Sequence, residues 1–206
     1  MTLARWKRSS PAPLLILLTL LAAGVPAARQ SADAGKPVTV YLVRHAEKQE
    51  PASNPDTETP LNAEGRARAQ ELAKLLSGCG IRAAYATQYR RTQDTAKPLL
   101  ERSKIQSAPV IIHSDHTADI PERIRVARET AVLVAGHSNT TAEVTRLLAG
   151  RSDAAPDIAH ETYHDLFVVT VLRWQPREAT VKHFRFGKKS PGSESSTLPE
   201  FAGCGK

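Results

Sequence analysis

The sequence has few cysteines, few aromatic residues and no long apolar run. Two of its 206 residues are cysteines, and aromatic residues make up 5%. The main apolar stretch, residues 14–23, is too short to span a bilayer comfortably. No run of lysines and arginines is interleaved with aromatic residues, so nucleic acid is not expected as a partner. What remains is the composition of an ordinary globular protein, with 41% apolar and 24% charged residues.

Residues 1–27 have the three parts of a secretory signal peptide. Arg5, Lys7 and Arg8 form a basic start without any acidic residue, an apolar stretch follows, and Val25-Pro26-Ala27 resembles a cleavage site. We therefore predict export to the periplasm or the exterior, with an uncleaved, membrane-anchoring signal as the alternative. Cleavage lowers the formal net charge from +7 to +4. After cleavage no stable membrane association is expected.

The two cysteines, Cys79 and Cys204, have two interpretations. In an exported protein an even number of cysteines permits a disulfide, and this pairing would tie the C-terminal tail to the segment after the first helix. The alternative is two free thiols, one of them in a mobile tail. The tail, residues 187–206, lacks hydrophobic periodicity, and we predict that it is disordered.

Hydrophobic periodicity predicts one α/β domain over residues 37–186, preceded by a polar linker at residues 28–36. Strands are predicted at residues 37–43, 81–86, 109–113, 131–135, 166–174 and 179–186. Helices are predicted after the N-cap residue Asn62, from about Arg91 to Glu101, from Pro121 to about Glu129, and from a Thr140–Glu143 capping box to Gly150. The alternation indicates a three-layer sandwich with a mostly parallel central sheet and helices on both faces. The last two strands form a C-terminal antiparallel hairpin that turns around residues 175–176.

Basic and imidazole side chains follow three of the predicted strands. Arg44 and His45 end the first strand, Arg90 and Arg91 follow the second, and His137 follows the fourth. The carboxyl ends of strands in such a sheet lie along one edge, so these groups are expected to converge there. Arginine binds phosphate oxygens bidentately, and a neutral imidazole is a competent nucleophile toward phosphorus. The pattern therefore predicts a phosphoryl-transfer site, which the polar loop after His45 could border.

Four segments of the sequence, in order, resemble the signatures of the histidine phosphatase superfamily, also called phosphoglycerate mutase-like. They are LVRHAEK at residues 42–48, LNAEG at 61–65, YATQYRRTQDTA at 85–96 and VLVAGHS at 132–138. A lone R-H-A would be a weak signal. Four segments in the right order, each at a strand end or a helix start, form a specific pattern over residues 38–150.

The resemblance implies a role for each matching residue. His45 would be the nucleophile that forms a phosphohistidine, Arg44 and Arg91 would hold the phosphoryl oxygens, and His137 would donate a hydrogen bond to them in the transition state. Arg91 is the matching arginine because it stands four residues before Thr95. Water would hydrolyse the phosphohistidine, so neither a metal nor an organic cofactor is expected. The expected substrate is a phosphorylated small molecule or a phosphoprotein, and no oligomeric state is predicted.

Only 46 positions separate Arg91 from His137, so the chain resembles a short, phosphatase-type member with an open site. Openness to water favours hydrolysis over intramolecular phosphoryl transfer. The alternative function is a non-catalytic phosphate- or phosphoprotein-binding module. The pair His45 and His137 argues against this alternative, because a protein that only binds phosphate does not need a nucleophile. The acid that protonates the leaving group has four candidates: Asp115, Asp119, Glu122 and Glu47.

Residues 160–164, HETYH, match the H-E-x-x-H signature of zinc proteases. That motif needs a long helix that presents both histidines on one face, together with a third metal ligand. The segment between Gly150 and the strand near Leu166 has no room for such a helix and lacks the apolar residues to bury it. We therefore expect a surface segment in which Tyr163 packs inward, with the roles of His160 and His164 unassigned.

Overall fold

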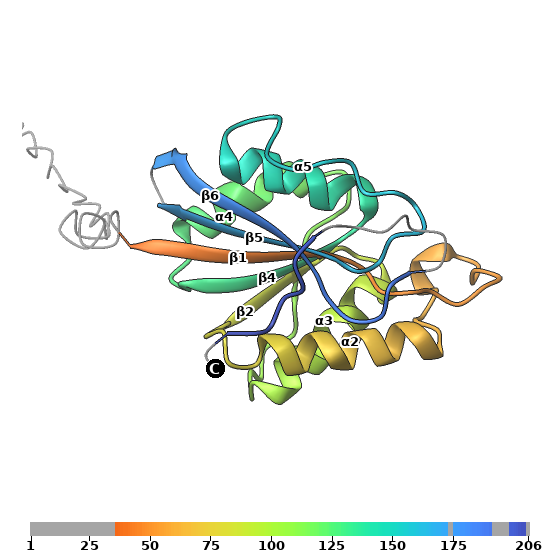
Figure 1. Ribbon diagram of the computed structural model, residues 1–206. Helices are drawn as coiled ribbons and strands as arrows, with labels where there is room; N and C mark the ends of the chain where they lie inside the picture. The colour runs from red at the N-terminus through yellow and green to blue at the C-terminus, as the bar shows by residue number, and fades with distance from the viewer. Residues whose placement is uncertain (1–35, 173–174, 191–197, 205–206) are drawn as a thin grey trace, which may run out of the picture.

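Strand β1 (Pro37–Arg44) lies inside the sheet, with a strand on each side and helices above and below (Figure 1). Its sequence is apolar almost throughout because both of its faces are buried. Val38, Val40 and Leu42 belong to the hydrophobic cluster on one face, and Tyr41 and Val43 belong to the cluster on the other. The strand ends where the apolar run gives way to Arg44, at the margin of both clusters.

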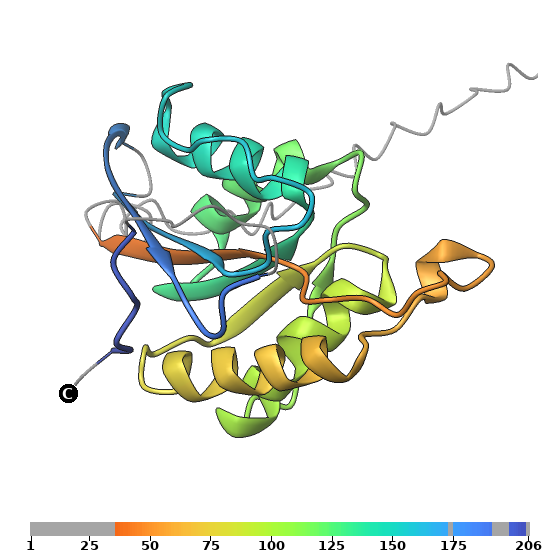
Figure 2. The same ribbon diagram turned by 45° about the vertical axis from the view of Figure 1, so that its right-hand side comes forward.

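The computed structural model describes residues 36–172, 175–190 and 198–204. In chain order after β1, the elements are η1 (Asp56–Glu58), α2 (Ala63–Leu76), β2 (Ala83–Ala86), α3 (Arg90–Arg102), β3 (Val110–Ile111), η2 (Thr117–Asp119), α4 (Ile120–Val126), β4 (Ala131–Gly136), α5 (Ser138–Ala149), β5 (Asp165–Leu172) and β6 (Gln175–Arg185). Helices α2 and α3 cover one face of the sheet, and α4 and α5 cover the other (Figures 1 and 2). The predicted three-layer sandwich is confirmed. Among the described residues, no helix is long and apolar enough to cross a membrane.

The sheet is mostly parallel, with the strand order β3-β2-β4-β1-β5-β6. Strand β4 pairs in parallel with both β1 and β2, while β5 and β6 form the expected antiparallel pair at one side. The carboxyl ends of β1, β2 and β4 therefore lie at one edge of the sheet. The loop after β1 projects from this edge in both views (Figures 1 and 2).

Helix α2 is fastened to the segment that follows β1. The predicted N-cap is confirmed, since the Asn62 side chain accepts a hydrogen bond from the Gly65 backbone N–H. Gly65 packs so closely on this segment that a Cβ atom there would lie 2.1 Å from the Glu47 carbonyl oxygen. The backbone N–H of Asn62 also donates to that oxygen. Residue 65 must therefore be glycine for the helix to approach the chain just beyond His45.

Several predicted boundaries differ from the structure, including the end of α4 at Val126 and the short β3, and two of the differences concern α5 and the hairpin. Helix α5 begins at Ser138, because the Thr140 hydroxyl accepts a hydrogen bond from the His137 backbone N–H and so completes the first turn earlier than a Thr140–Glu143 box would. Gln175 pairs with Leu172, so residues 175–176 belong to β6 and not to the predicted turn. The earlier start of α5 makes His137 its N-cap residue.

The C-terminal tail is not disordered in its described parts, and that prediction is wrong for residues 187–190 and 198–204. Ser190 and Phe201 are buried, and the Phe201 backbone N–H donates to the Arg185 carbonyl. The tail packs as an extended segment through a few side chains, which leaves no periodic signal in the sequence. The predicted signal peptide and residues 28–35 of the predicted linker lie outside the described residues.

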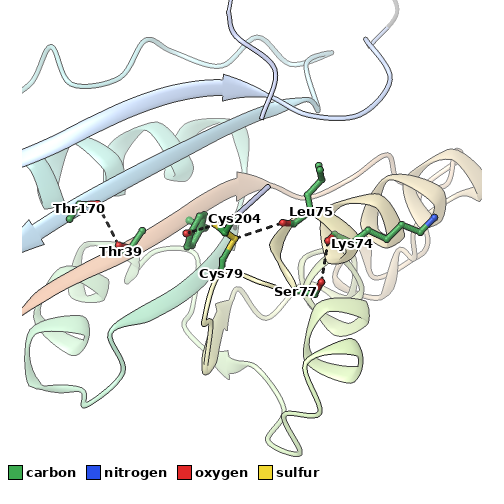
Figure 3. Close-up of a disulfide and its surroundings, with 8 residues drawn as sticks. Thr39, Lys74, Leu75, Ser77, Cys79, Thr170 and Cys204 are labelled. Carbon is green, nitrogen blue, oxygen red and sulfur yellow. Dashed lines mark hydrogen bonds between the residues drawn. A yellow bond between two sulfur atoms is a disulfide. The ribbon is translucent and has the colours of Figure 1, made fainter. Parts of the chain in front are cut away.

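Cys79 and Cys204 form a disulfide, across 125 positions of the sequence (Figure 3). The alternative of two free thiols is therefore wrong. The bond joins the turn after α2 to the end of the tail, and the hydroxyl of Tyr41 lies 3.1 Å from Cys204 Sγ. Phe201 contacts the Tyr41 ring edge-on. The tail thus adds a covalent and an aromatic contact to the α2–α3 side of the core.

We expect the double variant Cys79→Ser/Cys204→Ser to lose about 2–4 kcal/mol of unfolding free energy, because a disulfide that closes a long loop restricts the unfolded chain. Urea denaturation of both proteins measures this difference. A reductant should destabilise the wild type by a similar amount and leave the double variant unchanged. Equal urea midpoints for reduced and oxidised wild type would contradict the prediction.

Candidate active site

His45 is placed by the junction of β1 and β4. Its backbone N–H donates to the Gly136 carbonyl at 2.8 Å, which continues the pairing of the two strands by one residue. The ring Nδ1 lies 2.8 Å from the Ala46 carbonyl oxygen. A carbonyl only accepts hydrogen bonds, so Nδ1 carries the proton. The other ring nitrogen, Nε2, then holds a lone pair.

Arg44 is anchored at one end of its guanidinium group. Its Nη1 donates to the carbonyl oxygens of Ala159, His160 and Thr162, and the Tyr163 ring lies 4.1 Å from Cζ. Only 3% of the Arg44 surface is exposed, and burial lowers the pKa of the guanidinium. Among the described residues, its buried Nε–H has no hydrogen-bond partner.

Arg91 is anchored in the same manner by the loop after β1. Its Nη1 donates to the Asp56 carbonyl at 3.0 Å, its Nη2 donates to the Asp56 carboxylate at 3.1 Å, and Cζ lies 4.2 Å from the Tyr89 ring centre. Burial is the largest single effect on the pKa of Asp56 and raises it, but the Arg91 charge, the hydrogen bonds from Thr59 and Arg91 and the Lys48 charge together hold the pKa below its ordinary value. Within the described part of the chain, the buried Nε–H of Arg91 also lacks a partner.

His137 faces His45 from the start of α5. The two ring centres are 5.3 Å apart, and the Tyr89 ring packs edge-on against His137 at 4.9 Å. The Nε2 atom of His137 lies 2.9 Å from the hydroxyl of Thr87, at the end of β2. Three strand ends thus bring the two imidazoles together, as the sequence predicted for neighbouring strands of a parallel sheet.

Both imidazoles are neutral at physiological pH. Burial is the largest cause that lowers the pKa of His45, to about 2, and the charges of Arg44, His137 and Arg91 lower it further against the hydrogen bond to Ala46. Burial also lowers the pKa of His137, to about 4, together with the charges of Arg91 and Arg44. The site therefore combines two permanent cations with two unprotonated rings.

An open hollow of about 290 Å³ lies beside Arg91 and His137. The other residues that line it are Tyr89, Ser114, Asp115, Asn139 and Thr140. Two arginines, two histidines and an adjacent polar hollow form a site that can bind a small anion and offer it a nucleophile.

The four candidate acids occupy different places. Asp115 lines the hollow, whereas Asp119 and Glu122 are not among its lining residues. Glu47 is buried and accepts hydrogen bonds from Nε and Nη2 of Arg68, at distances between 2.6 and 2.9 Å. Glu47 is therefore engaged in a buried ion pair, and Asp115 is the candidate placed to reach a bound molecule.

The sequence analysis missed four residues of the site. Asp56 and Tyr89 contact Arg91, Thr87 contacts His137, and Tyr163 packs on Arg44 and lies near His45. Three of them come from loops or turns, where no periodicity marks which side chain points inward. The position of Asp56 in the polar loop after His45 was the one available signal, since that loop was expected to border the site.

The H-E-x-x-H segment lies on a turn and not on a helix. The His160 side chain is 77% exposed, whereas His164 is 2% exposed and its Nδ1 lies 3.3 Å from Ser190 Oγ. The two rings therefore do not share one face, and the zinc-protease alternative lacks its structural basis. The carbonyls of this turn instead anchor Arg44.

Comparison with known proteins agrees with this geometry. The sequence profile of the histidine phosphatase superfamily (branch 1) matches residues 40–115, which include Arg44, His45 and Arg91. No curated protein matches the sequence significantly.

Three solved structures share the fold. The protein histidine phosphatase SixA in complex with tungstate has a TM-score of 0.57 at 16% identity, covering 75% of this chain and 97% of SixA. The alpha-ribazole phosphatase from Shigella flexneri has a TM-score of 0.55 at 17% sequence identity, and the match covers 76% of this chain and 100% of that protein. A mycobacterial glucosyl-3-phosphoglycerate phosphatase has a TM-score of 0.51 at 13% sequence identity, and the match covers 73% of this chain and 98% of that protein. The chain is therefore similar in fold to these phosphatases, and its residues 40–115 are similar in sequence to the histidine phosphatase superfamily.

Proposed function

We propose that this protein is a phosphatase that hydrolyses phosphomonoesters, or phosphohistidine on a protein, through a phosphohistidine intermediate on His45. One observation carries the proposal. Arg44 and Arg91 are both more than nine-tenths buried beside His45, and in the described chain each has a buried Nε–H without a partner. Buried donors of this kind are normally satisfied, and an oxyanion is the acceptor that suits two guanidinium groups.

In the first step, the Nε2 lone pair of His45 attacks phosphorus and the bond to the leaving group breaks. Nδ1 keeps its proton and donates it in a hydrogen bond to the Ala46 carbonyl, so the attacking Nε2 stays unprotonated. Arg44 and Arg91 neutralise the phosphoryl oxygens, and His137 donates a hydrogen bond to them as charge develops. The leaving atom takes the bonding electrons and a proton from Asp115.

In the second step, water attacks the phosphorus of the phosphohistidine and gives a proton to the Asp115 carboxylate, which restores the acid. The P–N bond breaks, its electron pair returns to Nε2, and inorganic phosphate leaves with the oxygen of the water. No metal is required, because the two arginines supply the positive charge that a metal would supply.

The nature of the leaving group follows from the open, polar hollow beside the site. Such a hollow admits a bulky leaving group, including a protein side chain. Two of the structural neighbours are described as a protein histidine phosphatase and as an alpha-ribazole phosphatase, one for each substrate class of the proposal. Both classes share the phosphoryl group that the arginines would hold.

We expect His45→Ala to lower hydrolysis of p-nitrophenyl phosphate by at least about 10³-fold, since it removes the nucleophile itself. Steady-state kinetics of the purified protein measure this loss. The wild type quenched in acid-free buffer during turnover should carry phosphate on His45, detected by mass spectrometry.

The non-catalytic binding module predicts a different result. Such a module would bind inorganic phosphate but would show no turnover in the wild type and no labelling of His45. A chelator should leave the rate of the wild type unchanged. Hydrolysis that survives in His45→Ala would overturn the proposed mechanism.

The depressed pKa values predict that activity persists into acid. An imidazole with an ordinary pKa near 6.5 would be only about 3% neutral at pH 5. As the pH falls, His137 becomes protonated first, near its pKa of about 4, and His45 stays neutral down to its pKa of about 2. We therefore expect kcat/KM for p-nitrophenyl phosphate, corrected for the ionisation of the ester, to stay constant from pH 8 to pH 5. An acid limb centred near pH 6.5 would contradict this expectation.

The role of Asp115 predicts a dependence on the leaving group. Asp115→Asn should lower kcat/KM about 10²-fold for an alkyl phosphate, whose departing oxygen needs a proton, and change it little for p-nitrophenyl phosphate. Parallel kinetics with both esters measure the difference. Asp119→Asn, a neighbouring exposed carboxylate outside the hollow, serves as the control and should affect neither ester. Equal losses for both esters in Asp115→Asn would exclude it as the acid.

A further inference from the structure

The two phosphate-binding arginines are held in the same way by different parts of the chain. Arg44 donates from Nη1 to backbone carbonyls of residues 159–162, and Arg91 donates from Nη1 and Nη2 to Asp56. In the described protein, Nε of each remains buried and without a partner. The acceptors therefore engage the Nη atoms of both guanidinium groups and leave the Nε sides for a ligand.

Asp56 is itself fixed before it reaches Arg91. Its other carboxylate oxygen, Oδ1, accepts a hydrogen bond from the hydroxyl of the fully buried Thr59 at 3.1 Å. That hydroxyl in turn accepts from the Ser53 backbone N–H at 2.9 Å, and the Thr59 backbone N–H donates to the Asp56 carbonyl. The loop thus holds Asp56 in one orientation, with its carbonyl and Oδ2 toward Arg91.

We propose that Asp56 is a positioning residue that orients Arg91 so that its Nε side faces the phosphoryl group. A planar guanidinium that donates two hydrogen bonds from its Nη atoms to fixed acceptors cannot rotate about its own axis. Without the Asp56 carboxylate, Nη2 of Arg91 would lose its acceptor, and the guanidinium would be held only by the bond from Nη1 to the backbone carbonyl of residue 56. Preorganised donors stabilise a transition state because no reorientation is needed during the reaction. The proposal rests on the phosphoryl site proposed above.

The opposite role is a carboxylate that competes with phosphate for Arg91. The contacts favour the orienting role. Asp56 accepts hydrogen bonds from the Nη atoms of Arg91, while among the described residues Nε is the donor without a partner. A competitor would be expected to cover the donors that the ligand needs. The two roles predict opposite changes in phosphate affinity when Asp56 is removed.

The test is a double-mutant cycle between Asp56 and Arg91, with binding of inorganic phosphate to the whole protein measured by isothermal titration calorimetry. Asp56→Ala should weaken phosphate binding about tenfold and lower kcat/KM by a similar factor, as expected for a misplaced binding group. In the Arg91→Ala background, Asp56→Ala should cause no further loss, because Asp56 acts through Arg91. Asp56→Asn keeps an acceptor oxygen and should bind phosphate more tightly than Asp56→Ala.

The matched control is Glu58→Gln, which removes the same charge from the same short helix, η1, two residues away. Its phosphate affinity should stay within twofold of that of the wild type. Tighter phosphate binding by Asp56→Ala than by the wild type would identify a competitor and overturn the proposal. The proposal would also be overturned if Asp56→Ala weakened phosphate binding by the same factor in the Arg91→Ala background as in the wild type. Phosphate binding does not require turnover, so an inactive wild type that shows the expected cycle would refute the phosphatase and leave the positioning role intact.

Discussion

The structure depends on keeping two arginine side chains buried next to each other. Burying a charge costs several kcal/mol, and the charges of Arg44 and Arg91 also repel each other. The protein offsets this with backbone carbonyls, the Asp56 carboxylate and the faces of two tyrosine rings. The carbonyls and the carboxylate accept from Nη atoms and the tyrosine rings pack on the guanidinium faces, while in the described part of the chain both Nε–H groups lack a partner. A bound phosphoryl group would supply the missing acceptors and much of the missing negative charge.

The same burial sets the chemistry of the histidines. Removal from water and two nearby cations both disfavour an imidazolium, so His45 and His137 stay neutral. The hydrogen bond from Nδ1 of His45 to Ala46 then decides which nitrogen holds the lone pair. Features that make the pocket attractive to an anion therefore also keep Nε2 of His45 unprotonated, as the proposed nucleophile requires. The loop with Asp56 and the turn with Tyr163 add the parts that the sheet itself does not provide.

The C-terminal tail shows how a segment without regular structure still supports the site. The Ser190 hydroxyl accepts a hydrogen bond from the Tyr163 backbone N–H, and the Phe186 N–H donates to the His164 carbonyl. These contacts hold the turn whose carbonyls anchor Arg44. Farther along, the disulfide of Cys204 fastens the tail to the end of α2. Disorder was predicted because periodicity detects helices and strands, whereas this tail packs through isolated side chains.

The sequence by itself determined the sandwich and the mostly parallel sheet, because apolar runs mark buried strands. It also predicted that Arg44, His45 and His137 meet at one sheet edge, because a polar residue directly after such a run emerges there. The choice of Arg91 over Arg90 came from the family resemblance. Tertiary structure alone decided that Cys79 pairs with Cys204, that Asp115 lines the hollow while Glu47 is paired with Arg68, and that Asp56 reaches Arg91. Each of these facts joins residues that are distant along the chain, and their contacts depend on loop paths that no local pattern encodes.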